Sequence, residues 1–184
     1  MSNTKQTYSR TSGAKAGKTN VSKSKATKSP AAVSDKSKSA AWVSWFDPEK
    51  NASLTGKFED IDSLSNIVRV AIKGVDTKVF YAFASSAAIP DKYLAELINT
   101  SPRTLSNYKE QHKPLEPVKG EHLLRLIALF KKGEEVFGTL REFQGWLTKP
   151  KMKADKAPID WLITPGGVDL VSQELDRIAY GYPV

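Results

Sequence analysis

Residues 94–110, LAELINTSPRTLSNYKE, constrain the fold most, because they read as two helices joined by a short polar turn. Ser101 is a good N-cap for the second helix, and Pro102 suits its first position. Leu105 and Tyr108 lie three residues apart and form an inward-facing pair. The pattern predicts a helix-turn-helix.

The outward face of the second helix is polar and has no acidic residue before Glu110. Arginine can bind guanine and asparagine can bind adenine through two hydrogen bonds, while lysine and hydroxyl groups bind phosphates. This composition favours a helix that reads DNA over a helix that only faces solvent. The predicted DNA-binding residues are Arg103, Thr104, Ser106, Asn107 and Lys109.

Apolar spacing predicts further helices before this motif. From Ile61 to a stop at Gly74, the apolar positions are Ile61, Leu64, Val68 and Ala71, with Ile67 and Ile72 beside them. Residues 77–88, TKVFYAFASSAA, fit either a buried strand or a helix, and their place before the helix-turn-helix favours a helix. Residues 91–98 form the next helix.

Four more helices are predicted after the motif. Residues 118–137 carry a broad apolar stripe and form a central packing helix. Thr139 and Glu142 are spaced as a capping box for the helix that follows. A short PIDWLI helix then precedes a last helix that starts at Thr164 and ends near Gly181. Its predicted inward face is Val168, Leu170, Val171, Leu175 and Ile178.

The net charge of +8 is concentrated at the N-terminus. Residues 1–40 hold nine basic residues against Asp35 alone, whereas the other nineteen basic and nineteen acidic residues cancel. This Lys/Ser-rich tail lacks the apolar surface needed to fold, so we expect it to be disordered. It could bind DNA phosphates or only solubilise the chain. Trp42, Trp45 and Phe46 follow it as a core or dimer contact.

The sequence offers little for catalysis. There is no cysteine, and His112 and His122 lie on different elements without metal-ligand spacing. The Gly166-Gly167 pair lacks a phosphate-loop motif, which favours a capped helix start. We therefore expect no catalytic residue, metal or cofactor, and a protein that is not an enzyme. Without a secretory signal or a membrane-length apolar run, the predicted location is cytoplasmic.

The last fifty residues carry a more specific pattern, and together with the preceding motif they resemble Xre/MbcA/ParS-type antitoxins. The resemblance covers roughly residues 61–184. One departure is that residues 151–156 contain no glycine, where the family usually has one. The matching features are Phe137-Gly138, Trp146-Leu147-Thr148, Pro150, Pro158, Trp161-Leu162, a Thr164-led helix, Arg177-Ile178 and Gly181.

The resemblance implies an antitoxin that caps the active-site cleft of a RES-domain toxin, an enzyme that consumes NAD or uses it for ADP-ribosylation. It also implies autorepression through promoter DNA, and a homodimer within a hetero-oligomeric complex. Trp161 is expected mainly in the core, whereas the tyrosines suit an exposed interface. The implied toxin-binding residues are Trp161, Arg177, Tyr180, Gly181 and Tyr182.

The predicted fold class is all-α: a helix-turn-helix bundle followed by a small helical toxin-binding domain. The predicted domains are a tail at 1–40, a helix-turn-helix and dimerisation domain at 41–132 and a toxin-binding domain at 133–184. The alternatives are a DNA-binding transcriptional regulator without an enzyme partner, an inhibitor with a vestigial helix-turn-helix, and a tail-driven nucleic-acid binder.

Overall fold

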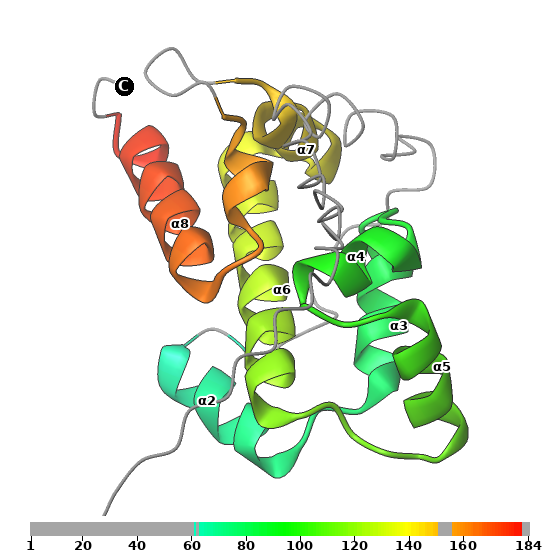
Figure 1. Ribbon diagram of the computed structural model, residues 1–184. Coiled ribbons are helices and arrows are strands. Elements are labelled where there is room, and N and C mark those ends of the chain that lie inside the picture. The colour runs from blue at the N-terminus through cyan, green and yellow to red at the C-terminus, as the bar shows by residue number, and fades with distance from the viewer. Residues whose placement is uncertain (1–60, 62, 151–155, 182–184) are drawn as a thin grey trace, which may run out of the picture. The chain divides into compact units, whose positions relative to one another are not determined.

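The computed structural model describes residues 61, 63–150 and 156–181, all within the second of two compact units, Val33–Val184. These residues form seven α-helices and one 3-10 helix, without a strand, which confirms the all-α prediction (Figure 1). The predicted tail, the Trp42, Trp45 and Phe46 cluster, residues 151–155 of the segment without glycine, and Tyr182 lie outside the described residues.

In the described part of the chain, two helices precede the helix-turn-helix. Helix α2 (Leu64–Lys73) begins where the Ser63 hydroxyl accepts a hydrogen bond from the Asn66 N–H, and it ends at Gly74, whose φ of 97° suits glycine. Helix α3 (Thr77–Ser86) is the segment for which a strand was the alternative. Residues 77–86 are helical throughout, which confirms the helical interpretation, and Phe80 and Phe83 are fully buried.

The predicted helix-turn-helix is present as α4 (Asp91–Leu97) and α5 (Pro102–Glu110), both packed against α3. The turn places Asn99 at φ 52°, a left-handed conformation that asparagine tolerates better than most residues. The Ser101 hydroxyl accepts a 3.0 Å hydrogen bond from the Thr104 N–H, and Leu105 is buried. The cap and the inward residue were both predicted.

Helix α6 (Pro117–Phe137) is the central element and packs against α2, α7 and α8 (Figure 1). Phe130 and Phe143 meet edge to face at 5.2 Å in a cluster of aromatic rings. Gly133 lies under the Phe143 ring, where a Cβ atom would come within 2.4 Å of it. The predicted domain boundary after residue 132 falls inside this helix, and one hydrophobic core extends on both sides of it.

The C-terminal part consists of α7 (Leu140–Thr148), the 3-10 helix η2 (Pro158–Trp161) and α8 (Pro165–Ala179). The Thr139 hydroxyl caps α7 by accepting the Glu142 N–H. The Thr164 hydroxyl caps α8 by accepting the Gly167 N–H at 3.1 Å, as the predicted helix start requires. None of the described helices is long and apolar enough to cross a membrane.

Three predicted inward residues face solvent instead. Val168, Val171 and Leu175 are buried against the core, whereas Leu170 is 54% exposed, because two residues on from Val168 is the opposite side of a helix. On α2, the buried residues are Ile67 and Ala71. Leu64 and Ile72, which the sequence placed in the apolar set, are 57% and 71% exposed.

Candidate interaction surfaces

The exposed face of α5 is the first candidate surface. Arg103, Ser106 and Asn107 are exposed and lie three and four residues apart, which places them on one side of the helix. Glu110 completes this face and accepts a hydrogen bond from the Ser106 hydroxyl at 3.4 Å. Glu110 was not among the predicted DNA-binding residues, although its spacing of seven from Arg103 places it on the same face. A glutamate can accept a hydrogen bond from cytosine.

Two predicted DNA-binding residues lie on the flanks of α5 rather than on this face. Thr104 is half-buried, and its hydroxyl lies 2.8 Å from the Ser101 hydroxyl within the helix cap. Lys109 points toward α3, with its Nζ atom 4.6 Å from the centre of the Tyr81 ring. Burial, and to a smaller extent the charge of Asp91, raise the pKa of Tyr81. Tyr81 therefore stays neutral beside the lysine.

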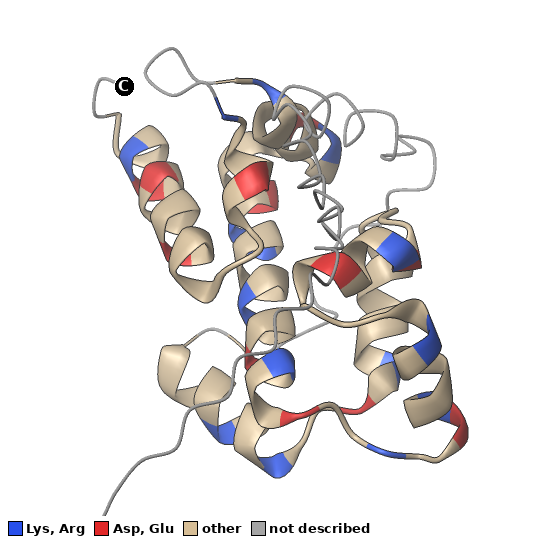
Figure 2. Cartoon of the chain, in the orientation of Figure 1, with Lys and Arg blue, Asp and Glu red and all other residues tan. Residues whose placement is uncertain are grey.

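A groove of ≈620 Å³ runs beside the turn between α4 and α5. Lys92 of α4 and Lys119 of α6 line it, and Lys119 also pairs with Glu116 at 3.1 Å. Figure 2 shows basic residues on α4, on α5 and on the first turn of α6. The sequence pattern could not indicate these lysines, because they come from helices on either side of α5.

The outer face of α8 is the second candidate surface. Leu170, Gln173, Arg177 and Tyr180 are exposed, and their spacing of three, four and three residues aligns them along one side of the helix. Tyr180 is 77% exposed, and Arg177 pairs with Glu174 at 3.2 Å. Gly181 follows at φ 71°. We call Leu170, Gln173, Arg177 and Tyr180 the α8 stripe.

Trp161 lies on η2 and is 38% exposed, so the expectation that its main role is in the core is wrong. The structure adds Leu170 and Gln173 to the residues that the sequence indicated on this side of the chain. Leu170 was missed because its apolar side chain was assigned to the inward face. Tyr182, the remaining predicted residue, lies outside the described residues.

The segment between η2 and α8 is held by side chains from elsewhere in the fold. The Nε2 atom of buried His122 on α6 donates to the Leu162 carbonyl at 2.8 Å. Burial lowers the pKa of His122, although the bond to Leu162 opposes that effect. His122 therefore has a structural role, and no group of acidic or histidine residues in the described part of the chain could hold a metal ion.

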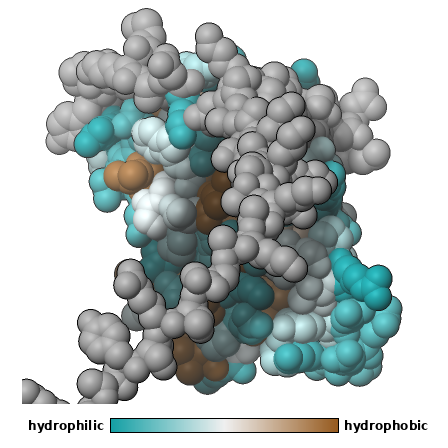
Figure 3. Space-filling model, in the orientation of Figure 1, coloured by the Kyte–Doolittle hydropathy of each residue, from teal (hydrophilic) through white to brown (hydrophobic). Residues whose placement is uncertain are grey.

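The hydrophobic side chains of α2 form a third surface. Leu64 and Ile72 are exposed, half-buried Val68 lies between them, and the three residues are four apart on one side of the helix. Figure 3 shows hydrophobic surface over α2. We call these three residues the α2 stripe.

Comparison with known families assigns both halves of the described chain. Residues 67–128 match the antitoxin Xre-like helix-turn-helix domain. Residues 132–181 match the antitoxin Xre/MbcA/ParS C-terminal toxin-binding domain. No curated protein matches the chain.

The chain is thus a helix-turn-helix protein with a C-terminal partner-binding domain. It belongs to the Xre-type antitoxins, the proteins that neutralise the toxin of a toxin–antitoxin module.

Proposed function

We propose that the chain neutralises a RES-domain toxin by placing the α8 stripe and Trp161 over the active-site cleft of that enzyme. The observation that carries the proposal is the α8 stripe itself, which combines Leu170 and Tyr180 with the charged Arg177. Aromatic and arginine side chains dominate the energy of many protein interfaces. An inhibitor that blocks a cleft needs shape and anchoring side chains rather than catalytic groups.

In this proposal the toxin, and not the antitoxin, uses NAD, either by consuming it or by transferring ADP-ribose to a target. The chain itself supplies binding surface and no enzymatic step, and it acts in the cytoplasm where its partner is made. The predicted residues Arg177, Tyr180, Gly181 and Tyr182 are the proposed contacts, together with Leu170 and Gln173.

A growth-rescue experiment tests the toxin-binding part. The product of the gene adjacent to this one is expressed alone or with the antitoxin, while growth and cellular NAD are followed. Arg177→Glu with Tyr180→Ala should abolish rescue, whereas Arg141→Glu, a charge reversal at an exposed site on α7, should preserve it. Substitution is preferable to truncation after Gly138, because residues beyond it, among them Phe143 and Leu175, belong to the core.

We further propose that the α5 face binds the promoter of the antitoxin's own operon and represses it. The predicted residues Arg103, Ser106 and Asn107 would contact bases, and Thr104 and Lys109 would contact phosphates at the flanks. Lys92 and Lys119 extend the phosphate-binding surface on either side. A reporter driven by this promoter should be derepressed by Arg103→Ala with Asn107→Ala, and repression that persists would contradict the proposal.

A homodimer within a larger complex with the toxin is the proposed assembly. The α2 stripe supports it, because Leu64 and Ile72 lie symmetrically about Val68 and an antiparallel copy would match each with the other. The chain has no cysteine, so Val68→Cys would introduce its only thiol. Mild oxidation should join two copies through residue 68. Gln173→Cys on α8 is the control, and equal cross-linking of both variants would argue against this interface.

The runner-up function is a DNA-binding regulator without an enzyme partner. The α5 face supports it by itself, since it needs nothing from α8. The two functions differ in the growth experiment, because this regulator predicts a harmless neighbouring gene product and no effect of Arg177→Glu.

A further inference from the structure

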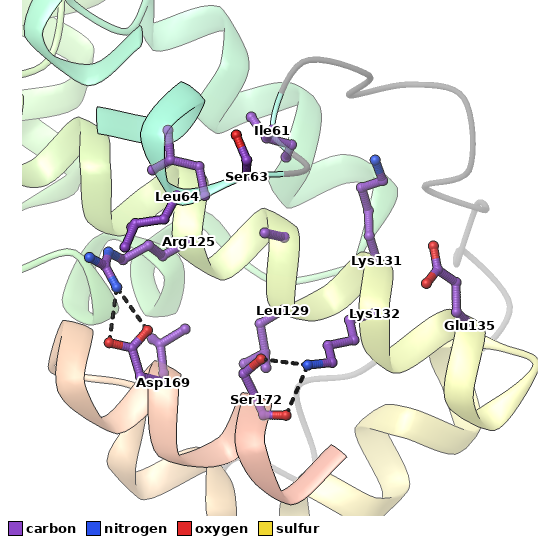
Figure 4. Close-up of a pocket in the computed structure, with 13 residues that line it drawn as sticks. Ile61, Ser63, Leu64, Arg125, Leu129, Lys131, Lys132, Glu135, Asp169 and Ser172 are labelled. Carbon is purple, nitrogen blue, oxygen red and sulfur yellow. Dashed lines mark hydrogen bonds and ion pairs between the residues drawn. The ribbon is translucent and has the colours of Figure 1, made fainter. Parts of the chain in front are cut away.

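Two ion pairs and a pair of hydrogen bonds join α6 to α8 along one side. Figure 4 shows the contacts of Arg125 with Asp169 and of Lys132 with Ser172. The guanidinium of Arg125 donates to both carboxylate oxygens of Asp169, at 2.7 and 3.0 Å. The ammonium of Lys132 lies 2.7 Å from the Asp176 carboxylate. It also donates to the hydroxyl and the carbonyl of Ser172, at 2.9 and 3.1 Å. We call this set of contacts the α6–α8 ladder.

The spacing of the α6–α8 ladder matches on the two helices. Arg125 and Lys132 are seven residues apart on α6, and Asp169 and Asp176 are seven residues apart on α8. At 1.5 Å per residue both separations are about 10 Å. The two helices run in the same direction (Figure 1). One axial register therefore satisfies both ion pairs at once, and a shift of α8 by one turn would break both.

The buried face of α8 defines this register less sharply. It consists of Gly167 and three aliphatic residues, Val168, Val171 and Leu175. Apolar contact is non-directional, so such a face tolerates small rotations and shifts better than paired charges do. Arg125 is also held from its own helix, because Glu121 accepts a hydrogen bond from its Nε atom at 2.9 Å. The Arg125 side chain is therefore oriented by Glu121 of its own helix as well as by Asp169.

The register of α8 matters because the proposed docking surface has two parts. Trp161 lies on η2, whose connection to α8 is held by His122 through Leu162. The α8 stripe lies on the helix that the α6–α8 ladder holds. The close approach of the Trp161 carbonyl to Gly167 fixes the first turn of α8 against η2, so the α6–α8 ladder sets the direction in which the α8 stripe extends away from Trp161.

We propose that Arg125 and Lys132 are positioning residues that fix α8 in the register in which the α8 stripe and Trp161 dock together on the toxin. Neither residue belongs to the α8 stripe. Arg125 is only 15% exposed in its side chain, so it acts through Asp169 and not by touching the partner. The inference rests on the proposed toxin-binding function and adds the contacts that hold the α8 stripe and Trp161 in place for docking.

Hydrogen exchange measured on the full chain, without a partner, tests whether the α6–α8 ladder stabilises α8. Arg125→Met with Lys132→Met should accelerate exchange of the amides of α8, while those of α3 to α5 keep their protection. Lys119→Met is the matched control, because it removes a lysine from the ion pair with Glu116, away from α8. Unchanged protection of α8 would overturn the proposal.

Affinity for the product of the adjacent gene is the second measurement. Each single substitution should weaken binding about fivefold, since exposed ion pairs contribute up to ~1 kcal/mol. The exchanged pair, Lys132→Glu with Asp176→Lys, restores the ion pair but not the donation to the Ser172 carbonyl, so it should recover part of the affinity and protection that Lys132→Glu alone removes. Affinity lost without faster exchange, or not rescued by the exchanged pair, would show direct contact with the partner and refute positioning. If the adjacent gene product binds neither the wild type nor any variant, the proposed toxin-binding function is refuted. The hydrogen-exchange result then still decides whether the α6–α8 ladder positions α8.

Discussion

The side-chain amide of Asn99, in the turn of the helix-turn-helix, donates a 3.3 Å hydrogen bond to the carbonyl of Ile163, just before α8. A second contact of this kind joins the buried amide of Gln144 on α7 to the carbonyl of Ala87 at the end of α3, at 2.7 Å. The segments that match the two antitoxin domains therefore share side-chain contacts as well as a hydrophobic core.

Two substitutions of Asn99 should separate the contribution of its hydrogen bond to Ile163 from that of its left-handed backbone conformation. Asn99→Ala loses the bond to Ile163 and puts alanine, which tolerates the left-handed region less well than asparagine does, at φ 52°, so it should cost about 1–2 kcal/mol of unfolding free energy. Asn99→Gly loses the bond but relieves the backbone, so it should cost less. Urea denaturation of both variants measures this difference. Equal losses would mean that the backbone conformation contributes nothing.

Alanine substitutions at Gly166 and Gly167, the adjacent glycines at the start of α8, should have opposite effects on stability. A Cβ atom on Gly167 would lie 1.9 Å from the Trp161 carbonyl oxygen, so Gly167→Ala must displace η2 or α8, at a cost of about 1–3 kcal/mol. A Cβ atom on Gly166 meets nothing within 4 Å, and Gly166→Ala should leave stability unchanged or improve it by up to ~1 kcal/mol. Thermal denaturation of the two variants compares them directly. Similar melting temperatures would contradict the close approach of η2 to α8.

The helices could be predicted from the sequence because their signals are local. Ser101, Thr139 and Thr164 each cap the helix that the pattern assigned to them, and Gly74 ends α2 as expected. Periodicity also selected buried positions, among them Ile67 on α2 and Val171 and Leu175 on α8. It failed where a helix is apolar on more of its surface than its neighbours cover, as at Leu64 on α2.

The interaction surfaces could be predicted only in part. Arg103 and Asn107 could be assigned to one exposed face from the sequence, because a single helix carries that face. Lys119 could not be assigned to this region from the sequence, since it lies on α6 and lines the groove beside the turn only in the folded chain. The α6–α8 ladder could not be predicted either, because Arg125 and Asp169 are forty-four residues apart and their pairing exists only after the helices pack.

The stability of the fold should fall as the pH is lowered through the range where histidine titrates. Burial lowers the pKa of His122 from its usual 6.5. Below that value the unfolded chain binds a proton that the folded chain resists, so folding loses free energy as the pH falls. Above pH 6.5 the His122 side chain is neutral in both the folded and the unfolded chain, so it does not contribute to the change of stability with pH.

His122→Gln tests this explanation, because the glutamine amide can donate to the Leu162 carbonyl but does not titrate. The unfolding free energy of the wild type should decrease more between pH 7.5 and pH 5 than that of the variant. His112 is exposed, and His112→Gln is the control that should follow the wild type. A variant with the same pH dependence as the wild type would assign the loss to other groups.

Operator binding should distinguish the α5 face from its flanks. Arg103→Ala and Asn107→Ala should each cost about 1–3 kcal/mol on the operator and little on unrelated DNA, because each removes a contact to a base. Lys92→Ala should weaken binding to both DNAs alike and reduce the dependence on salt, because Lys92 lines the groove beside the turn and is proposed to contact phosphates. Titration of labelled operator and unrelated DNA at two salt concentrations gives both quantities. If Arg103→Ala lowers the two affinities equally, Arg103 is a phosphate contact, and the sequence preference must come from other residues of α5.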